Sequence, residues 1–303
     1  MPIKTPSVFS VLRVLCVLCA SAFSKINPHR RSGSSPCGAF VDKAAARFDT
    51  RTKMSLDLND LLRDWPHEPG QIKVRKILGT DQKEKIQLRI DLGLIQMEMN
   101  GRPDGFEPYD CESLLHYHTQ RAGRAAKKQE DYELTPEEVG ELQQEGIQYY
   151  HRYISLFQLN DFLGVIRDTA RNLEMFEFVS DHSTNEDLAW SVEQFTPYVR
   201  MMNTRAKAAI AIEREKHADA CALIEKGMED IRGFYEKTEN IEMIQQSPEL
   251  SFLQEWLEEI RANQPLTKLE KMQREMDRAI AQEAYEKAAE LRDQIKAMTT
   301  RKR

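Results

Sequence analysis

Residues 266–295, LTKLEKMQREMDRAIAQEAYEKAAELRDQI, carry two amphipathic helical patterns in succession. In the first, apolar side chains recur every three or four residues, the spacing that lines one face of a helix. Thr267 and Glu270 form a capping box, which predicts a helix beginning at Lys268. The pattern is interrupted around Gln282, and a second apolar stripe follows. The stretch is therefore predicted to fold as a helical hairpin.

The predicted hairpin is too small to stand alone. About 30 residues cannot support a core of their own, so the apolar stripe needs another surface to cover it. The residues expected to contact that surface are Leu269, Met276, Ile280, Tyr285, Ala288, Ala289, Leu291, Arg292, Asp293 and Ile295. The alanines allow two helix backbones to approach closely, and the adjacent charges of Arg292 and Asp293 are suited to fixing the register of a contact.

The second half of the hairpin also carries a family resemblance. The run Met-x-x-Ala-Ile-x-x-Glu-x-Tyr-Glu-x-Ala-Ala-x-Leu-Arg-Asp-x-Ile, from Met276 to Ile295, resembles the UVR motif. In that family the hairpin is the element by which UvrB and UvrC of bacterial excision repair recognise each other, and similar hairpins occur in the stress-response proteins McsA and ClpC. The resemblance implies docking on a protein with a similar hairpin, or on a second copy of this chain. It covers about an eighth of the sequence, and no helicase, nuclease or zinc motif of those proteins accompanies it.

Composition describes a soluble globular protein with many surface helices: 41% of the 303 residues are hydrophobic and 30% are charged. The charges are unevenly distributed. Residues 1–53 hold nine Lys and Arg against two acidic residues, and the remainder holds 34 basic and 47 acidic residues. Since phosphate binding depends on a basic patch, this acidic body makes direct nucleic-acid binding unfavourable.

Residues 1–53 are predicted to be a leader that is disordered or not translated. An apolar run at residues 8–22 imitates an export signal, which is the alternative reading, but Arg13 interrupts it and it is too short to span a membrane. Composition typical of a soluble protein begins abruptly at Met54, the expected natural start. Only Cys111 and Cys221 follow, which favours a reducing cytoplasm.

Residues 54–108 are predicted to form a small antiparallel β-meander. Apolar side chains at positions 86, 88, 90 and 92 alternate with polar ones, the pattern of a half-buried strand, and shorter strands are expected on either side. A sheet of this size needs a helix against its apolar face. Residues 100–105, NGRPDG, are interpreted as a turn, with a binding loop as the alternative.

Residues 109–263 are predicted to be an all-helical, repeat-like body, so the fold class is mainly α. Thr135 caps a helix that leads into an antiparallel helix pair over residues 149–173, with Phe162 just after the turn. The pair resembles a tetratricopeptide unit. A fainter copy follows after about 55 residues, longer than the ~34 of that family, which predicts an extra helix within residues 181–198.

No catalytic, metal or cofactor motif is apparent. Phosphate-cradling glycine loops, nucleophile elbows and paired Cys-x-x-Cys motifs are missing from residues 54–303. Cys111, His116 and His118 lack a fourth ligand, and the adjacent Asp181-His182-Ser183 is typical of a cap and turn. The sequence therefore favours a non-enzymatic adaptor without metal or cofactor. The alternatives are a DNA-repair accessory factor that contacts nucleic acid directly, and an enzyme built on the sheet and its loops.

Overall fold

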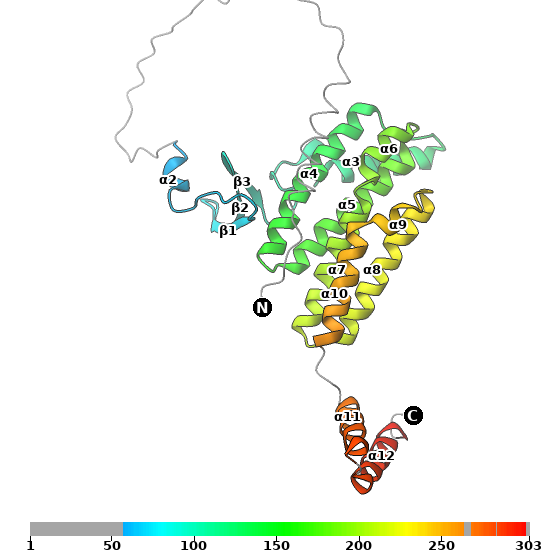
Figure 1. Ribbon diagram of the computed structural model, residues 1–303. Coiled ribbons are helices and arrows are strands. Elements are labelled where there is room, and N and C mark those ends of the chain that lie inside the picture. Colours follow the sequence, from blue (N-terminus) through cyan, green and yellow to red (C-terminus); the bar gives the residue numbers. More distant parts are fainter. Residues whose placement is uncertain (1–56, 264–267, 283, 301–303) are drawn as a thin grey trace, which may run out of the picture. The chain divides into compact units, whose positions relative to one another are not determined.

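The computed structural model describes residues 57–263, 268–282 and 284–300, and it confirms the mainly helical fold class (Figure 1). The chain divides between Ala206 and Lys207 into two compact units. The predicted leader lies outside the described residues, and the domain limits placed at residues 108 and 263 remain predictions. No described helix combines the length and apolar character that crossing a membrane requires.

Three strands form the predicted meander near the start of the first unit. They are β1 (Lys73–Leu78), β2 (Glu84–Ile90) and β3 (Gly93–Glu98), paired antiparallel in the order β1-β2-β3. A short helix, α2 (Asn59–Leu62), precedes them. Ile86, Leu88 and Met97 are buried, and helix α4 contacts both β1 and β2. The expected helix against the apolar face is therefore present.

The predicted alternation fails at the end of β2. The strand ends at Ile90, and Leu92 lies in the turn to β3 with 89% of its surface exposed. The chain must reverse at this point, so Leu92 has no neighbouring strand to cover it. On the other face Gln87 is buried, because Arg75 donates to it from β1 at 2.8 Å and it donates to Gln96 of β3 at 3.0 Å.

The helices of the first unit begin and end at local sequence signals. They are α3 (Leu114–Lys128), α4 (Pro136–Gln158), α5 (Phe162–His182) and α6 (Glu186–Glu193), with the 3-10 turn η1 (Pro108–Asp110) before them and α7 (Thr196–Glu213) spanning the boundary between the units. Thr135 caps α4 as predicted, and Glu138 completes a capping box with it. Asn160, at φ 58°, reverses the chain, and Asp161 then caps α5.

Helices α4 and α5 form the predicted antiparallel pair (Figure 1). Tyr153, Phe162 and Val165 are buried as expected. Phe157 and Ile166 are only half-buried, although Phe157 contacts Phe162 edge to face with ring centroids 5.5 Å apart. Helix α6 is the extra helix expected in the insert.

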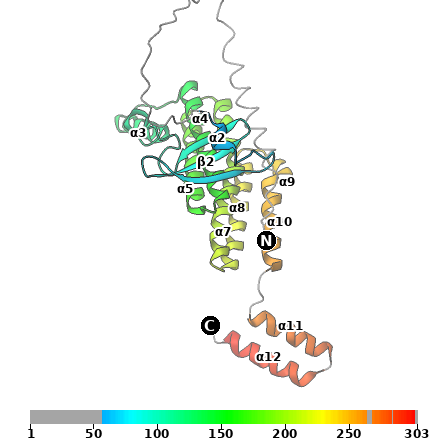
Figure 2. The same cartoon turned by 90° about the vertical axis from the view of Figure 1, so that its left-hand side faces the viewer.

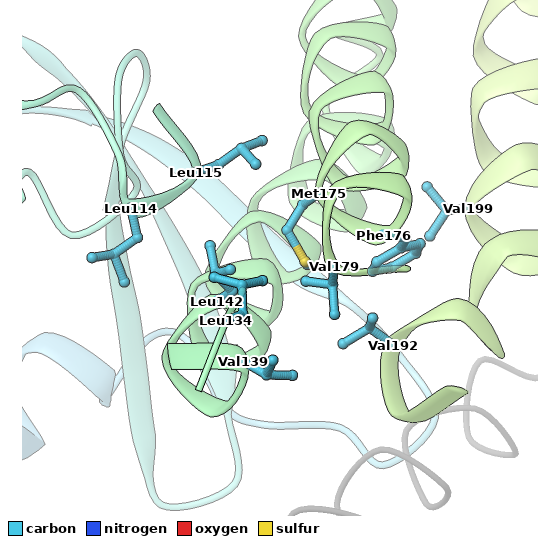
Figure 3. Close-up of a cluster of buried hydrophobic side chains, with 10 residues drawn as sticks. All are labelled: Leu114, Leu115, Leu134, Val139, Leu142, Met175, Phe176, Val179, Val192 and Val199. Atoms are coloured by element: carbon cyan, nitrogen blue, oxygen red, sulfur yellow. The ribbon is translucent and has the colours of Figure 1, made fainter. Parts of the chain in front are cut away.

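A continuous apolar core joins these helices (Figure 3). Its buried members are Leu114, Leu115, Leu134, Val139, Leu142, Met175, Phe176, Val179, Val192 and Val199. They come from α3 to α7 and from the segment before α4, so elements distant in sequence share one core. Burial of this apolar surface is the main stabilising contribution to the unit.

A buried ionic network ties the loop after β3 to the helix pair. Arg152 of α4 pairs with Asp168 of α5, and both side chains are fully buried. The Arg152 Nη1 also donates to the carbonyl oxygens of Glu98 and Gly101, at 3.1 and 2.8 Å. Arg167 donates to the carbonyl oxygen of Met99 at 3.0 Å. These hydrogen bonds hold the loop through its backbone carbonyls, so they do not depend on the side chains of the loop.

Glu145 of α4 extends this network to the start of α3. Its fully buried carboxylate accepts hydrogen bonds from the amides of Leu114 and Leu115, at 2.8 and 3.3 Å. A carboxylate at a helix N-terminus satisfies amides that have no partner within the helix. Arg102 and Arg171 supply the opposite charge to Glu145.

The second unit contains the remaining helices. They are α8 (His217–Lys237), α9 (Met243–Gln246), α10 (Pro248–Asn263), α11 (Lys268–Ala281) and α12 (Tyr285–Thr300). Helices α8 and α10 lie side by side in Figures 1 and 2, and Ile224, Ile231, Leu253 and Leu257 on them are buried. The two segments of the second predicted pair form helices α7 and α8, with Glu215 at φ 59° between them, and their pairing remains a prediction.

Candidate docking site in the C-terminal hairpin

Helices α11 and α12 form the predicted hairpin, and they pack side by side (Figure 2). Helix α11 begins at Lys268 as expected, while the predicted cap Thr267 lies outside the described residues. At the turn, the amide of Gln282 donates to the carbonyl of Arg278 at 3.1 Å, and that of Ala284 to the carbonyl of Ala279 at 2.8 Å. These hydrogen bonds end α11 and begin the reversal of the chain direction, so no long loop is needed before α12.

The hairpin has an apolar seam. Met272 and Ala279 of α11, and Ala288 and Leu291 of α12, are each exposed by no more than 9%. Met276 and Ile295 are half-buried. Small alanine side chains on both helices allow the two backbones to approach closely. Much of the apolar stripe is thus used inside the hairpin.

A second group of predicted contact residues faces outward. Ile280 is 48% exposed and Tyr285 is 67% exposed, although both are apolar and lie beside the turn. Ala289, Arg292 and Asp293 are exposed as well. Arg292 and Asp293 pair with each other at 3.0 Å, with both side chains 68% exposed. This surface combines apolar area with exposed charge.

The ten predicted residues therefore divide between seam and surface. Leu269 lies in α11, but its side chain is outside the described part of the structure. Sequence spacing places seam and surface residues on one stripe, so it could not separate them. It also left Met272 and Ala279 out of the contact set, although both follow the same three-and-four spacing. Contact of any of the ten with a partner remains a prediction.

The hairpin coincides with a known sequence family. Residues 267–298 match the UVR family model, the UvrB/uvrC motif. The UVR motif is associated with protein–protein and DNA-repair-related interactions, and the matched residues cover α11 and most of α12. No curated protein and no solved structure matches the chain. The UVR motif is thus the part of the chain for which a comparison with known proteins supports a functional assignment.

Two other groups considered from the sequence have local structural partners. The His118 Nδ1 lies 2.6 Å from the hydroxyl of Tyr132, and His118 is buried. The His182 Nδ1 lies 2.9 Å from the carbonyl oxygen of Phe178, with the two rings stacked. Within the described residues, no three His, Cys, Asp or Glu side chains are grouped so that they could hold a metal ion.

Proposed function

We propose that this protein is a non-enzymatic adaptor that acts in the cytoplasm and docks on a partner protein through its UVR motif. The partner carries a similar helical hairpin or is a second copy of this chain. Excision repair and stress-response protein quality control are the two settings that the motif suggests. The helical body would then bind or position a second component.

The exposed apolar side chains of the motif carry this proposal. Ile280 and Tyr285 leave large apolar surfaces in water beside the turn, where the hairpin itself does not cover them. A partner hairpin that covers them would gain about 25 cal/mol for each square ångström of apolar area removed from water. The exposed pair of Arg292 and Asp293 lies on the same helix as Tyr285 and offers polar contacts at the rim of such an interface.

Charge distribution supports a protein partner over DNA. Residues 54–264 hold 24 basic and 40 acidic residues, which repels phosphate. The tail, residues 264–303, holds 10 basic and 7 acidic residues. This excess of positive charge is small compared with that of a typical nucleic-acid-binding site. Salt-sensitive binding of duplex DNA by the full chain would favour the accessory-factor alternative.

The test compares a charge introduced on the exposed surface with the same charge placed elsewhere. Ile280→Glu and Tyr285→Glu should leave the hairpin folded, because both side chains are exposed. Gln294→Glu is the matched control, since Gln294 is also exposed on α12. Light scattering of the full 35.2 kDa chain measures self-association, and affinity capture followed by mass spectrometry identifies other hairpin-bearing partners.

We expect the wild-type chain and the Gln294→Glu control to form a dimer or to capture a protein with a UVR-like hairpin, and the two surface variants to do neither. A chain that stays monomeric and captures no such protein would overturn the proposal. If Tyr285→Glu instead lowers the melting temperature of the body by several degrees, the hairpin packs on the body of its own chain and stabilises it, and the docking proposal is wrong.

A further inference from the structure

A polar hollow lies beside the loop that follows β3. Its volume is about 650 Å³, within the range of typical ligand sites. Three lining residues come from the β1–β2 turn and the start of β2, and the others come from the end of β3 and the segment before α3: Asp81, Lys83, Glu84, Glu98, Met99, Asn100, Gly101, Arg102, Gly105, Phe106, Glu107 and Glu112. The NGRPDG loop, residues 100–105, supplies part of this lining, so the structure places it where a binding loop would act.

The loop lining the hollow is rigidly supported. Arg152 and Arg167 hold the backbone carbonyls of Glu98, Met99 and Gly101 from the helix side. A site supported in this way needs little ordering when a ligand binds, which reduces the entropic cost of association. The buried network therefore prepares a fixed surface on the outer side of the loop.

The hollow carries an excess of negative charge. Its lining contains five carboxylates, those of Asp81, Glu84, Glu98, Glu107 and Glu112, against Lys83 and Arg102. Lys85 pairs with Asp81 and Glu98, and Arg102 pairs with Asp104 and Glu145. Within the described chain, Glu84, Glu107 and Glu112 form no ion pair. Three exposed carboxylates are thus available to a ligand.

Aromatic rings stand exposed next to these carboxylates. Phe106 lines the hollow and is 63% exposed, with the guanidinium carbon of Arg102 5.7 Å from its ring centre, and Tyr109, three residues later, is 64% exposed. The Tyr109 ring stacks on that of Tyr117 with centroids 4.2 Å apart. A cation over an aromatic face is attracted by the ring quadrupole, and guanidinium groups are the side chains most often found there.

We propose that this hollow binds an extended Lys- or Arg-containing segment of a partner protein. Glu84, Glu107 and Glu112 receive its cations, and Phe106 packs against an aliphatic stem or a guanidinium plane. Among the described residues no three His, Cys, Asp or Glu side chains are grouped so that they could hold a metal ion, so the separate cationic side chains of one segment fit these carboxylates better than a single ion. The inference does not depend on the UVR motif, which lies in the other compact unit.

A labelled peptide tests the proposal with the full-length protein. The probe is a fluorescein-labelled nonapeptide of alternating glycine and arginine, and the charge-reversed control replaces each arginine by aspartate. Anisotropy titrations compare wild type with the double variant Glu107→Gln/Glu112→Gln and with Phe106→Ala and Phe106→Tyr. The matched control is Glu255→Gln/Glu259→Gln, which removes the same charge from exposed positions of α10. Circular dichroism checks that every variant is folded.

The wild type should bind the arginine peptide with a dissociation constant of about 100 µM or below and ignore the aspartate peptide. Glu107→Gln/Glu112→Gln should weaken binding about tenfold, and the α10 control by less than about twofold. Phe106→Ala should weaken binding about threefold or more, and Phe106→Tyr should restore it. Equal weakening by both double variants would reveal general attraction to the acidic body and overturn the proposal. So would absence of binding by the folded wild type.

Discussion

Arg152 of α4 and Asp168 of α5 form a two-pronged ion pair, with Nε 2.7 Å from Oδ2 and Nη2 2.8 Å from Oδ1, and neither side chain reaches solvent. The pair joins helices α4 and α5, and Arg152 also donates to two carbonyl oxygens of the loop after β3. One guanidinium therefore connects both helices to the sheet region.

Removing one member of this pair should strongly destabilise the protein. Asp168→Ala leaves the Arg152 charge buried without its carboxylate, for which we expect a loss of about 3–5 kcal/mol in the free energy of unfolding. Urea denaturation followed by circular dichroism measures this loss. Arg167→Ala is the control, because the Arg167 side chain is 44% exposed although it also contacts Asp168. A loss below about 1 kcal/mol for Asp168→Ala would contradict the buried geometry.

Phe162→Ala should open a cavity between α4 and α5. The ring is 8% exposed and packs on Phe157, so its removal should cost about 3–5 kcal/mol of unfolding free energy. The neighbouring Leu163 is 72% exposed, and Leu163→Ala should change stability by about 0.5 kcal/mol or less. Thermal and urea unfolding of both variants provide the comparison. Equal effects at the two positions would show that the helix pair is oriented differently.

Stability should fall in mild acid because of His118. Burial lowers the pKa of His118, so the folded state favours the neutral ring; nearby Glu138 acts to raise the pKa and Arg121 to lower it. Tyr132 and Tyr117 also face the ring. The stability that comes from burying the neutral ring is fully present above the pKa of an unfolded histidine, about 6.5, and is lost as the pH falls below that value.

His118→Gln removes that titration and should flatten the dependence of unfolding free energy on pH between about 7.5 and 5. Burial also lowers the pKa of His151, so part of the slope should persist in this variant. Urea unfolding across the pH range measures the slope. An unchanged slope in His118→Gln would mean that His118 titrates normally in the folded protein.

The seam and the surface of the UVR motif should respond differently to charge. Ala288 is 8% exposed, and Ala288→Glu would bury an unpaired carboxylate at a cost of several kcal/mol, more than a small hairpin can withstand. Hydrogen exchange of the α11 and α12 amides in the full chain should become fast in Ala288→Glu and stay unchanged in Tyr285→Glu. Protection that survives Ala288→Glu would place Ala288 outside the seam.

Much of the fold follows from local signals in the sequence. The Thr135–Glu138 capping box set the start of α4, and the turn at Asn160 and Asp161 separated α4 from α5. The three-and-four spacing from Lys268 onward predicted the hairpin, and its residue pattern identified the UVR motif. These features depend on residues a few positions apart, so periodicity and capping are sufficient to predict them.

Tertiary structure decided which residues meet. The burial of Gln87 depends on Arg75 and Gln96 in neighbouring strands, and that of Arg152 depends on Asp168 and two loop carbonyls. Likewise, Ala288 turns into the hairpin seam while Tyr285 stays exposed, although both fit one stripe. The energy of a buried polar group depends on partners that are distant in sequence. The sequence therefore determined the helices, the strands and the UVR motif, and three-dimensional packing determined the ionic network, the hollow beside it and the outward face of the hairpin.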